Sequence, residues 1–224
     1  MAPSSAFEPL TAELRDGTRV LIRPIEPEDK GLLLSGFEEL SEQSRYRRFL
    51  APVPKLTEAQ LTYLTEVDHD AHEALVAVDA GQPLRGLGVA RYVRLQDHPE
   101  IAEAAVTVID AYQGRGLGTL LLALLARRAV DRGVERFRAY VLEENRPMRD
   151  LLESLGADVE HGLDVRHDSP GLLRMDTPLP ADPDAVLDTP AGEVLRAVAR
   201  GDIPEVATDR RTGEIEVIRP DDAG

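Results

Sequence analysis

The sequence predicts a domain of the α/β (α+β) class followed by an acidic C-terminal tail, and three observations support this prediction. Segments with strand periodicity and segments with helix periodicity alternate along the chain as far as Thr177. The 224 residues, of which 42% are hydrophobic, suffice for one good-sized domain with an ordinary core. Beyond Thr177 the composition changes to PLPADPDAVLDTP, which is typical of a linker or a loosely packed segment.

The N-terminal third predicts one strand and three helices. Residues 19–25, RVLIRPI, alternate as a strand does, and prolines close it. A helix is expected to begin at Pro27, since proline and acidic residues suit the first turn. Ser41 can cap a second, short helix through SEQSRYRRFL. A capping box that starts at Thr57 predicts a third helix, ending near Val67.

The middle of the chain predicts three strands and one strong helix. HEALVAVDA and GLGVARYVRL read as a hairpin around Gly81, and Ile101–Ile109 forms the next strand. The helix Thr119–Arg132 is the most strongly patterned, and Gly133 ends it. Its stripe consists of Leu117, Leu120, Leu121, Leu124 and Leu125.

The remaining segments complete the domain with a strand, a helix and an antiparallel pair. FRAYVL is the strand, and a helix is expected from Asn145 to the glycine at 156. DVEHGLDV and GLLRMDT are expected to pair antiparallel before Thr177. In the tail, AGEVLRAVARG is compatible with a short helix and GEIEVI with a short strand.

Composition excludes several classes of function. There is no cysteine, which excludes disulfides, thiolate metal sites and a cysteine nucleophile. The net charge of −15 disfavours nucleic acid and anionic membranes and favours cationic partners, although acidity also simply aids solubility. The N-terminal MAPSSAFEPL is unlike a signal peptide, and no apolar run is long enough for a membrane span. We therefore expect a cytoplasmic protein.

The spacing of the histidines does not indicate a metal site. The nearest pair, His69 and His72, is read as a polar start to a strand, and we expect no bound metal. The five histidines are His69, His72, His98, His161 and His167.

The chain contains RGLG twice, and the surrounding residues distinguish the two copies. The copy that begins at Arg85 leads into a strand and is assigned to hairpin geometry. The copy that begins at Arg115 lies between a strand and the leucine-striped helix, where free amides and the helix dipole favour an anion. Glycines at 114, 116 and 118 allow close approach of a ligand to the backbone. This copy is therefore the candidate phosphate site.

Two common phosphate motifs do not fit this loop. A Walker loop requires Gly-Lys-Ser/Thr, which the sequence lacks. A G-x-G-x-x-G dinucleotide fingerprint fails because Leu121 or Thr119 stands where the third glycine belongs. What remains is Q-x-x-G-x-G from Gln113 to Gly118, after AAVTVIDAY and before TLLLALLARRAVDRG.

This pattern resembles the pyrophosphate loop of the GNAT superfamily of acyl-CoA-dependent N-acetyltransferases. The resemblance implies a single GNAT-like domain over residues 14–177, with a mixed, mostly antiparallel sheet flanked by helices. Residues 1–13 then form an N-terminal arm, and residues 178–224 a linker and tail. It also implies that acetyl-CoA is the co-substrate. The residues expected to hold its pyrophosphate are Gln113, Gly114, Arg115, Gly116, Leu117, Gly118 and Thr119.

Within the superfamily, four segments are most similar to bacterial Pat-type protein lysine acetyltransferases: DGTRVLIRPIEPED, LSEQSRYRRFL, AEAAVTVIDAYQGRGLGT and VLEENRPM. The resemblance makes a protein lysine the first expectation for the acceptor, for example on an acyl-CoA synthetase. A small amine such as a polyamine or an aminoglycoside is the alternative.

Acetyl transfer to an alkylamine requires a base, because the amine binds as an ammonium ion at neutral pH. Glu103 is the candidate: its strand neighbours are apolar, so its carboxylate is expected to be partly desolvated and more basic. Pat-like enzymes place their general base at this position of the A-E-x-A-x-x-V run. The alternative for Glu103 is a structural one, in which it is an edge glutamate whose side chain reaches solvent. Glu100 is a weaker candidate for the base.

The resemblance assigns the remaining positions. A backbone N–H between Val106 and Val108 would polarise the thioester carbonyl, and pantetheine would run beside Val108. Asn145 would contact the pantetheine region, or alternatively only cap its helix. Many members carry a tyrosine seven residues after this asparagine, proposed as the acid for the leaving thiolate; here it is Leu152.

Leu152 keeps a non-catalytic alternative open: a module that binds acyl-CoA without turnover. A third interpretation, based on composition alone, is that the acidic tail docks a partner or a second copy of the chain as a homodimer.

Overall fold

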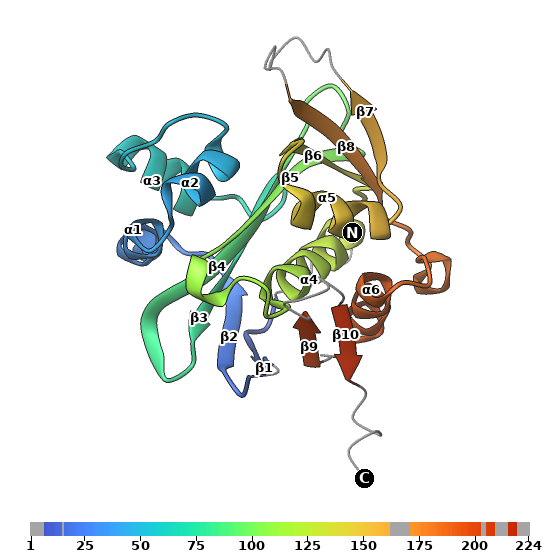
Figure 1. Ribbon diagram of the computed structural model, residues 1–224, viewed down its shortest axis with the longest axis horizontal. Coiled ribbons are helices and arrows are strands. Elements are labelled where there is room, and N and C mark those ends of the chain that lie inside the picture. The colour runs from blue at the N-terminus through green and yellow to red at the C-terminus, as the bar shows by residue number, and fades with distance from the viewer. Residues whose placement is uncertain (1–6, 15, 162–170, 203–204, 209–214, 219–224) are drawn as a thin grey trace.

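The computed structural model describes residues 7–14, 16–161, 171–202, 205–208 and 215–218. These residues form a mixed sheet with helices on both faces (Figure 1). The sheet order is β1-β2-β3-β4-β5-β6-β8-β7, and its one parallel pair is β5 with β6. The strands are β1 (Leu10–Glu13), β2 (Arg19–Pro24), β3 (His72–Asp79), β4 (Gln82–Arg94), β5 (Ile101–Val108), β6 (Arg136–Leu142), β7 (Asp158–His161) and β8 (Leu172–Pro178).

Helices α1, α2 and α3 lie on one face of the sheet, whereas α4, α5 and α6 lie on the other (Figure 1). Their bounds are α1 (Lys30–Glu38), α2 (Glu42–Phe49), α3 (Glu58–Thr65), α4 (Leu117–Asp131), α5 (Arg146–Ser154) and α6 (Pro190–Arg200). Single 3-10 turns occupy Pro27–Asp29, Asp110–Tyr112 and Pro183–Ala185. The predicted order of elements from residue 19 to Thr177 is confirmed, including the caps at Ser41 and Thr57.

The chain on either side of the expected domain also carries structure. Within the expected N-terminal arm, β1 pairs antiparallel with β2 and extends the sheet by one strand. After Thr177, Leu179 is buried and α6 packs on α4 through Val194 and Val198. Packing therefore continues from residue 10 to Arg200, beyond the expected bounds of 14 and 177.

A two-stranded sheet of β9 (Glu205–Thr208) and β10 (Ile215–Ile218) follows α6. β10 lies beside α6 and corresponds to the strand expected at GEIEVI. The acidic end of the tail, 219–224, and the second half of the expected strand DVEHGLDV lie outside the described residues.

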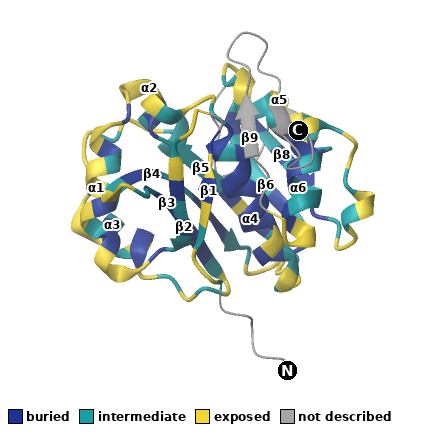
Figure 2. Cartoon of the chain, turned by 90° about the horizontal axis from the view of Figure 1, so that it is seen from below, coloured by how far each residue is buried: buried dark blue, intermediate teal, exposed yellow. Residues whose placement is uncertain are grey.

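Helix α4 is the centre of the main core. Its leucine stripe is buried against the sheet on one side, and α6 covers another side, so that the helix is surrounded by protein (Figure 2). A fully buried carboxylate, Glu73 of β3, accepts hydrogen bonds from the Arg128 guanidinium of α4 and lies 3.5 Å from that of Arg132. His69 contacts the same carboxylate at 2.7 Å. This charge-assisted network fixes α4 against β3.

The first RGLG lies in β4, which forms a hairpin with β3 as expected, and two of its glycines also have a packing role. A Cβ on Gly86 would lie 2.8 Å from a Leu32 side-chain carbon of α1. A Cβ on Gly88 would lie 3.0 Å from the Thr107 carbonyl oxygen of β5. Both glycines therefore permit close packing of β4 with its neighbours.

Candidate acyl-CoA site

A groove opens between β5 and β6. These parallel strands pair only at Ile101–Glu103 and Arg136–Arg138, after which they diverge. The gap continues between the phosphate-loop candidate, α4 and α5 as a groove of about 1090 Å³. Its lining includes Ala104–Val108, Tyr140 and Met148. A groove of this size has room for a large ligand.

Backbone amides of β5 face this groove. Ile109 donates its N–H to the Leu87 carbonyl oxygen on the β4 side, at 3.0 Å. Alternate residues of a strand direct their backbone groups to opposite edges. Val106 and Val108 therefore direct their N–H groups toward β6, into the gap. The two positions expected to polarise a carbonyl thus have the required direction.

The second RGLG forms the turn between β5 and α4. Gly114 has φ = 67° and Gly116 has φ = 82°, a left-handed backbone that other residues rarely adopt. Gly116 is the N-cap of α4, so the first amides of the helix are free to bind an anion. Gly118 and Thr119 line the groove. The side chain of Leu117 is buried in the core, which leaves only its backbone for a ligand.

Gln113 is exposed, but its side chain holds the loop in place through two hydrogen bonds. Its side-chain amide donates to the Val108 carbonyl oxygen at 2.9 Å and to Ser44 Oγ at 3.2 Å. Ser44 Oγ in turn donates to Asp110, which also accepts from the backbone N–H and hydroxyl of Ser41. Burial raises the pKa of Asp110, but these hydrogen bonds outweigh it and hold the pKa below the usual value. The network ties α2 to the loop.

Arg115 points away from the groove. Its guanidinium forms an ion pair with Asp16, before β2, and stacks 4.6 Å from the centre of the Tyr112 ring. Its side chain is not among the described groups that line the groove. Arg115 was expected to help hold the pyrophosphate, but its guanidinium is engaged outside the groove.

Asn145 stands at the N-cap position of α5, but its side chain makes no capping hydrogen bond. It is half-buried and lines the groove. The arrangement leaves its amide available to a ligand, which favours the pantetheine contact over a simple cap.

Leu152 is buried in a second apolar cluster with Val141, Leu173 and Met175, beside the groove. The position expected to carry an acid is therefore part of the core. Tyr140 lines the groove, whereas Tyr112 lies beneath the Arg85 and Arg115 guanidinium groups.

Glu103 lies where β5 and β6 begin to separate. In the sheet register it stands between Val93 of β4 and Arg138 of β6. Its side chain is exposed, so the expected desolvation is wrong. Alternation along β5 puts the Glu103 side chain on the face of the sheet opposite to the core-facing alanines. Helices α1–α3 lie on this same face as Glu103, but they cover only part of it. The carboxylate is therefore accessible to an acceptor from solvent.

Comparisons with known proteins decide the family. The model of the acetyltransferase (GNAT) family matches residues 36–157, which is more than half of the chain. The chain belongs to the GNAT acetyltransferase family. The enzymes of this family are acyl-CoA-dependent N-acetyltransferases, which use acetyl-CoA as co-substrate.

Two curated GNAT relatives and one solved structure are similar to most of the chain. "Acetyltransferase Pat" of Mycolicibacterium smegmatis is 40% identical over 150 residues, 66% of this chain and 44% of that protein. "Acetyltransferase PA5475" of Pseudomonas aeruginosa is 35% identical over 68% of this chain and 85% of that protein. The GNAT domain of S. lividans PAT is 31% identical, with a TM-score of 0.68, over 76% of this chain and 97% of that domain. The chain thus spans less than half of the Mycolicibacterium protein.

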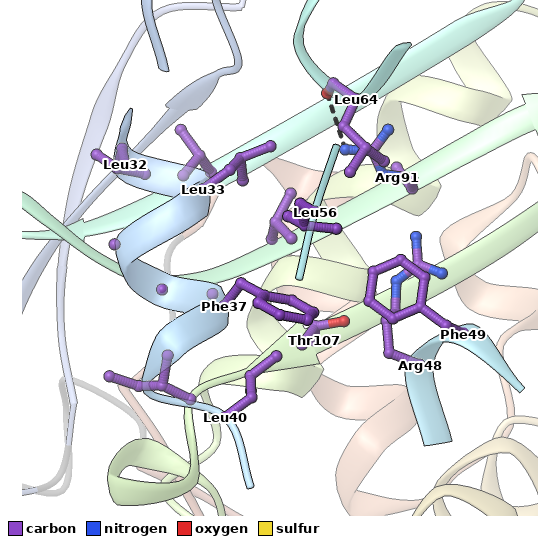
Figure 3. Close-up of a pocket in the computed structure, with 16 residues that line it drawn as sticks. Leu32, Leu33, Phe37, Leu40, Arg48, Phe49, Leu56, Leu64, Arg91 and Thr107 are labelled. Carbon is purple, nitrogen blue, oxygen red and sulfur yellow. Dashed lines mark hydrogen bonds between the residues drawn. The ribbon is translucent and has the colours of Figure 1, made fainter. Parts of the chain in front are cut away.

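Sequence reasoning missed two arginines on the α1–α3 face of this GNAT domain. Arg48 of α2 and Arg91 of β4 line a small chamber of about 70 Å³ beside β5 (Figure 3). Arg48 also lines the groove between β5 and β6. Because the two lie 43 positions apart, only the sheet topology brings them together. The repeated arginines of SRYRRFL were the available signal for Arg48.

His72 is neutral in this environment. Burial, and next the charge of Arg91, lower the pKa of His72 to about 4. Its Nε2 accepts from the Arg91 guanidinium at 3.0 Å. Among the described residues, no group of three or more His, Cys, Asp or Glu side chains could hold a metal ion. Within the same ranges, no helix combines the length and apolar character of a membrane span.

Proposed function

We propose that the chain transfers an acetyl group from acetyl-CoA to a primary amine, and that the acceptor is a protein lysine. The observation that carries the proposal is the groove, which joins a glycine loop at a helix N-terminus to free amides of a strand edge. The similarity to a Pat acetyltransferase supports a protein acceptor. The net charge of −15 favours a cationic partner.

The donor would bind along the groove. The α4 N-terminus and the loop at Gly114–Gly118 provide amides for the pyrophosphate, and the Asn145 side chain is placed for pantetheine. The N–H groups of Val106 and Val108 would then donate to the thioester carbonyl. They would stabilise the negative charge that develops on its oxygen as the amine attacks.

Glu103 would accept the proton of the acceptor ammonium, directly or through a water. Its exposure allows a large acceptor to reach it. With Leu152 buried in the core, the departing thiolate would take its proton from solvent. The amine nitrogen forms its bond to the acetyl carbon, the carbon–sulfur bond breaks, and the nitrogen releases its second proton to solvent as the amide forms.

Turnover of acetyl-CoA with a panel of amines tests this proposal. The panel contains acyl-CoA synthetases, a polyamine and an aminoglycoside, with mass spectrometry to locate modified lysines. Glu103→Gln is expected to lower kcat/KM at neutral pH by about 100-fold or more. Glu100→Gln, in the loop before β5, is the matched control and should retain activity. Full activity of Glu103→Gln contradicts its role as the base.

A non-catalytic acyl-CoA sensor is the second candidate, and the buried Leu152 favours it. Its expected result is tight binding of acetyl-CoA with no turnover on any amine. Preference for the small amines over proteins contradicts the protein-lysine proposal while leaving the chemistry intact.

A further inference from the structure

The chamber beside β5 combines apolar walls with a few polar groups. Leu33 and Phe37 of α1 are among the apolar residues that enclose it (Figure 3), and Val89 of β4 also lines it. Of its sixteen described lining residues, only Arg48, Arg91 and Thr107 have polar side chains. Apolar walls strengthen electrostatic interactions inside, because they exclude water.

Arg91 is a buried cation that has no carboxylate partner among the described residues. Only 5% of the residue is exposed, and its guanidinium donates to the Leu64 carbonyl oxygen at 2.9 Å and to neutral His72. Its Nε has no hydrogen-bond partner among the described residues. Burial, and then the charge of Arg48, lower the pKa of Arg91 to about 9, so it remains charged at neutral pH. Such a charge is costly unless an anion compensates it.

Arg48 adds a second charge at the mouth of the chamber. Its guanidinium stacks 5.1 Å from the centre of the Phe49 ring, and no carboxylate among the described residues lies within ion-pair distance. Burial lowers the pKa of Arg48, while the more distant charge of Glu103 acts in the opposite direction. The guanidinium is therefore available to a ligand.

Thr107 supplies a neutral hydrogen-bonding group on β5. Its Oγ1 is buried without a partner in the described part of the chain. Two guanidinium groups and a hydroxyl in an apolar chamber form a donor set that suits a carboxylate, which accepts from several donors at once.

The chamber communicates with the acyl-CoA groove, because Arg48 and Thr107 line both. We propose that Arg48, Arg91 and Thr107 form a carboxylate-binding subsite of the acyltransferase site, which selects a substrate that carries a carboxylate. This inference rests on the proposed function. The carboxylate can come from the far end of a dicarboxylic acyl group on CoA, or from an amine acceptor that also carries one.

Binding measurements test the subsite and do not depend on turnover. In the donor arm, calorimetry compares succinyl-CoA with butyryl-CoA, which has the same chain length but no carboxylate. In the acceptor arm, it compares 5-aminopentanoate with pentylamine on the CoA-saturated protein. The wild-type chain is expected to bind the carboxylated member at least tenfold more tightly in one arm, which identifies the source.

Variants identify the residues responsible. Arg48→Gln should abolish the preference and leave the affinity for the neutral member within threefold. Arg91→Lys should keep part of the preference for the carboxylated ligand, because lysine retains the positive charge but lacks the planar guanidinium that binds a carboxylate through two hydrogen bonds. Arg45→Gln, on the same helix but outside the chamber, is the matched control for the loss of one charge, and thermal melting checks folding. The inference is overturned if wild type shows no preference for the carboxylated ligand in either arm. It is also overturned if Arg48→Gln shows the same preference as wild type. Absence of any binding by CoA esters instead contradicts the proposed function.

Discussion

The side-chain amide of Gln113 donates a hydrogen bond to the backbone carbonyl oxygen of Val108 at 2.9 Å, across the turn that separates β5 from α4. The same amide reaches Ser44 Oγ of α2. One side chain thus sets the distance between the strand edge and the loop. The glutamine of the Q-x-x-G-x-G pattern therefore organises the site through these two hydrogen bonds.

Gln113→Ala is expected to weaken acetyl-CoA binding about five- to tenfold, because the loop loses its attachment to Val108. The free energy of unfolding should fall by about 1 kcal/mol, as for one lost hydrogen bond. Calorimetric titration and urea unfolding measure the two effects. Gln60→Ala, which removes the capping-box amide of α3, is the control: it should cost similar stability without changing affinity. Equal affinities of Gln113→Ala and wild type would show that the loop is positioned by other contacts.

Arg115→Gln is expected to change acetyl-CoA affinity less than threefold, because the guanidinium is engaged by Asp16 outside the groove. Stability should change by about 1 kcal/mol or less, as is usual for partly exposed ion pairs. Asp16→Asn removes the same ion pair without altering the loop, and it should change acetyl-CoA affinity and stability as little as Arg115→Gln does. A tenfold loss of affinity in Arg115→Gln alone would indicate that the side chain turns to the pyrophosphate.

The stability of the protein should fall as pH decreases through the range in which His72 titrates in the unfolded chain. The pKa of His72 is about 4 in the folded state and about 6.5 when unfolded. Between these values the unfolded chain binds more protons, so acidification favours unfolding. The contribution present above pH 6.5 should diminish by about 1 to 2 kcal/mol between pH 7.5 and pH 5.

Urea unfolding at pH 7.5 and pH 5 measures this effect. His72→Gln retains an acceptor for Arg91 but cannot titrate, and all other groups are common to both proteins. The variant should therefore lose less stability than wild type on acidification, by the same 1 to 2 kcal/mol. Identical losses in the two proteins contradict the assignment of a neutral, half-buried His72.

Local patterns carried most of the fold prediction. The leucine stripe from Leu117 to Leu125 packs on the sheet, and the alternation at the start of β5 follows its buried face, which is why both elements were predicted correctly. The four-residue β1 was missed because so short a segment shows no clear period. The packing of α6 was missed because proline and aspartate dominate the preceding segment, although Ala191, Val194 and Val198 have helical spacing.

The site was predictable only in its local part. The loop from Gln113 to Thr119 is continuous in sequence, so its strand-turn-helix context could be recognised. The exposure of Glu103 depends on how far α1–α3 extend over the sheet, which no local pattern fixes. The proximity of Arg48 and Arg91 depends on strand order, and the pairing of Arg115 with Asp16 joins residues 99 positions apart.

The central claim is that acyl-CoA lies in the groove between β5 and β6, against the N-terminus of α4. Calorimetric titration of acetyl-CoA into wild type and Gly118→Val tests it most directly. A Cβ at Gly118 would be 3.7 Å from a Val108 methyl, an ordinary contact, so the side chain should occupy groove space without disrupting the core. Gly31→Val on α1, where a Cβ meets open space, is the control. We predict one acetyl-CoA per wild-type chain, unchanged binding in Gly31→Val, and at least tenfold weaker binding in a folded Gly118→Val. Equal affinity of Gly118→Val and wild type, or no binding by folded wild type, would contradict the claim.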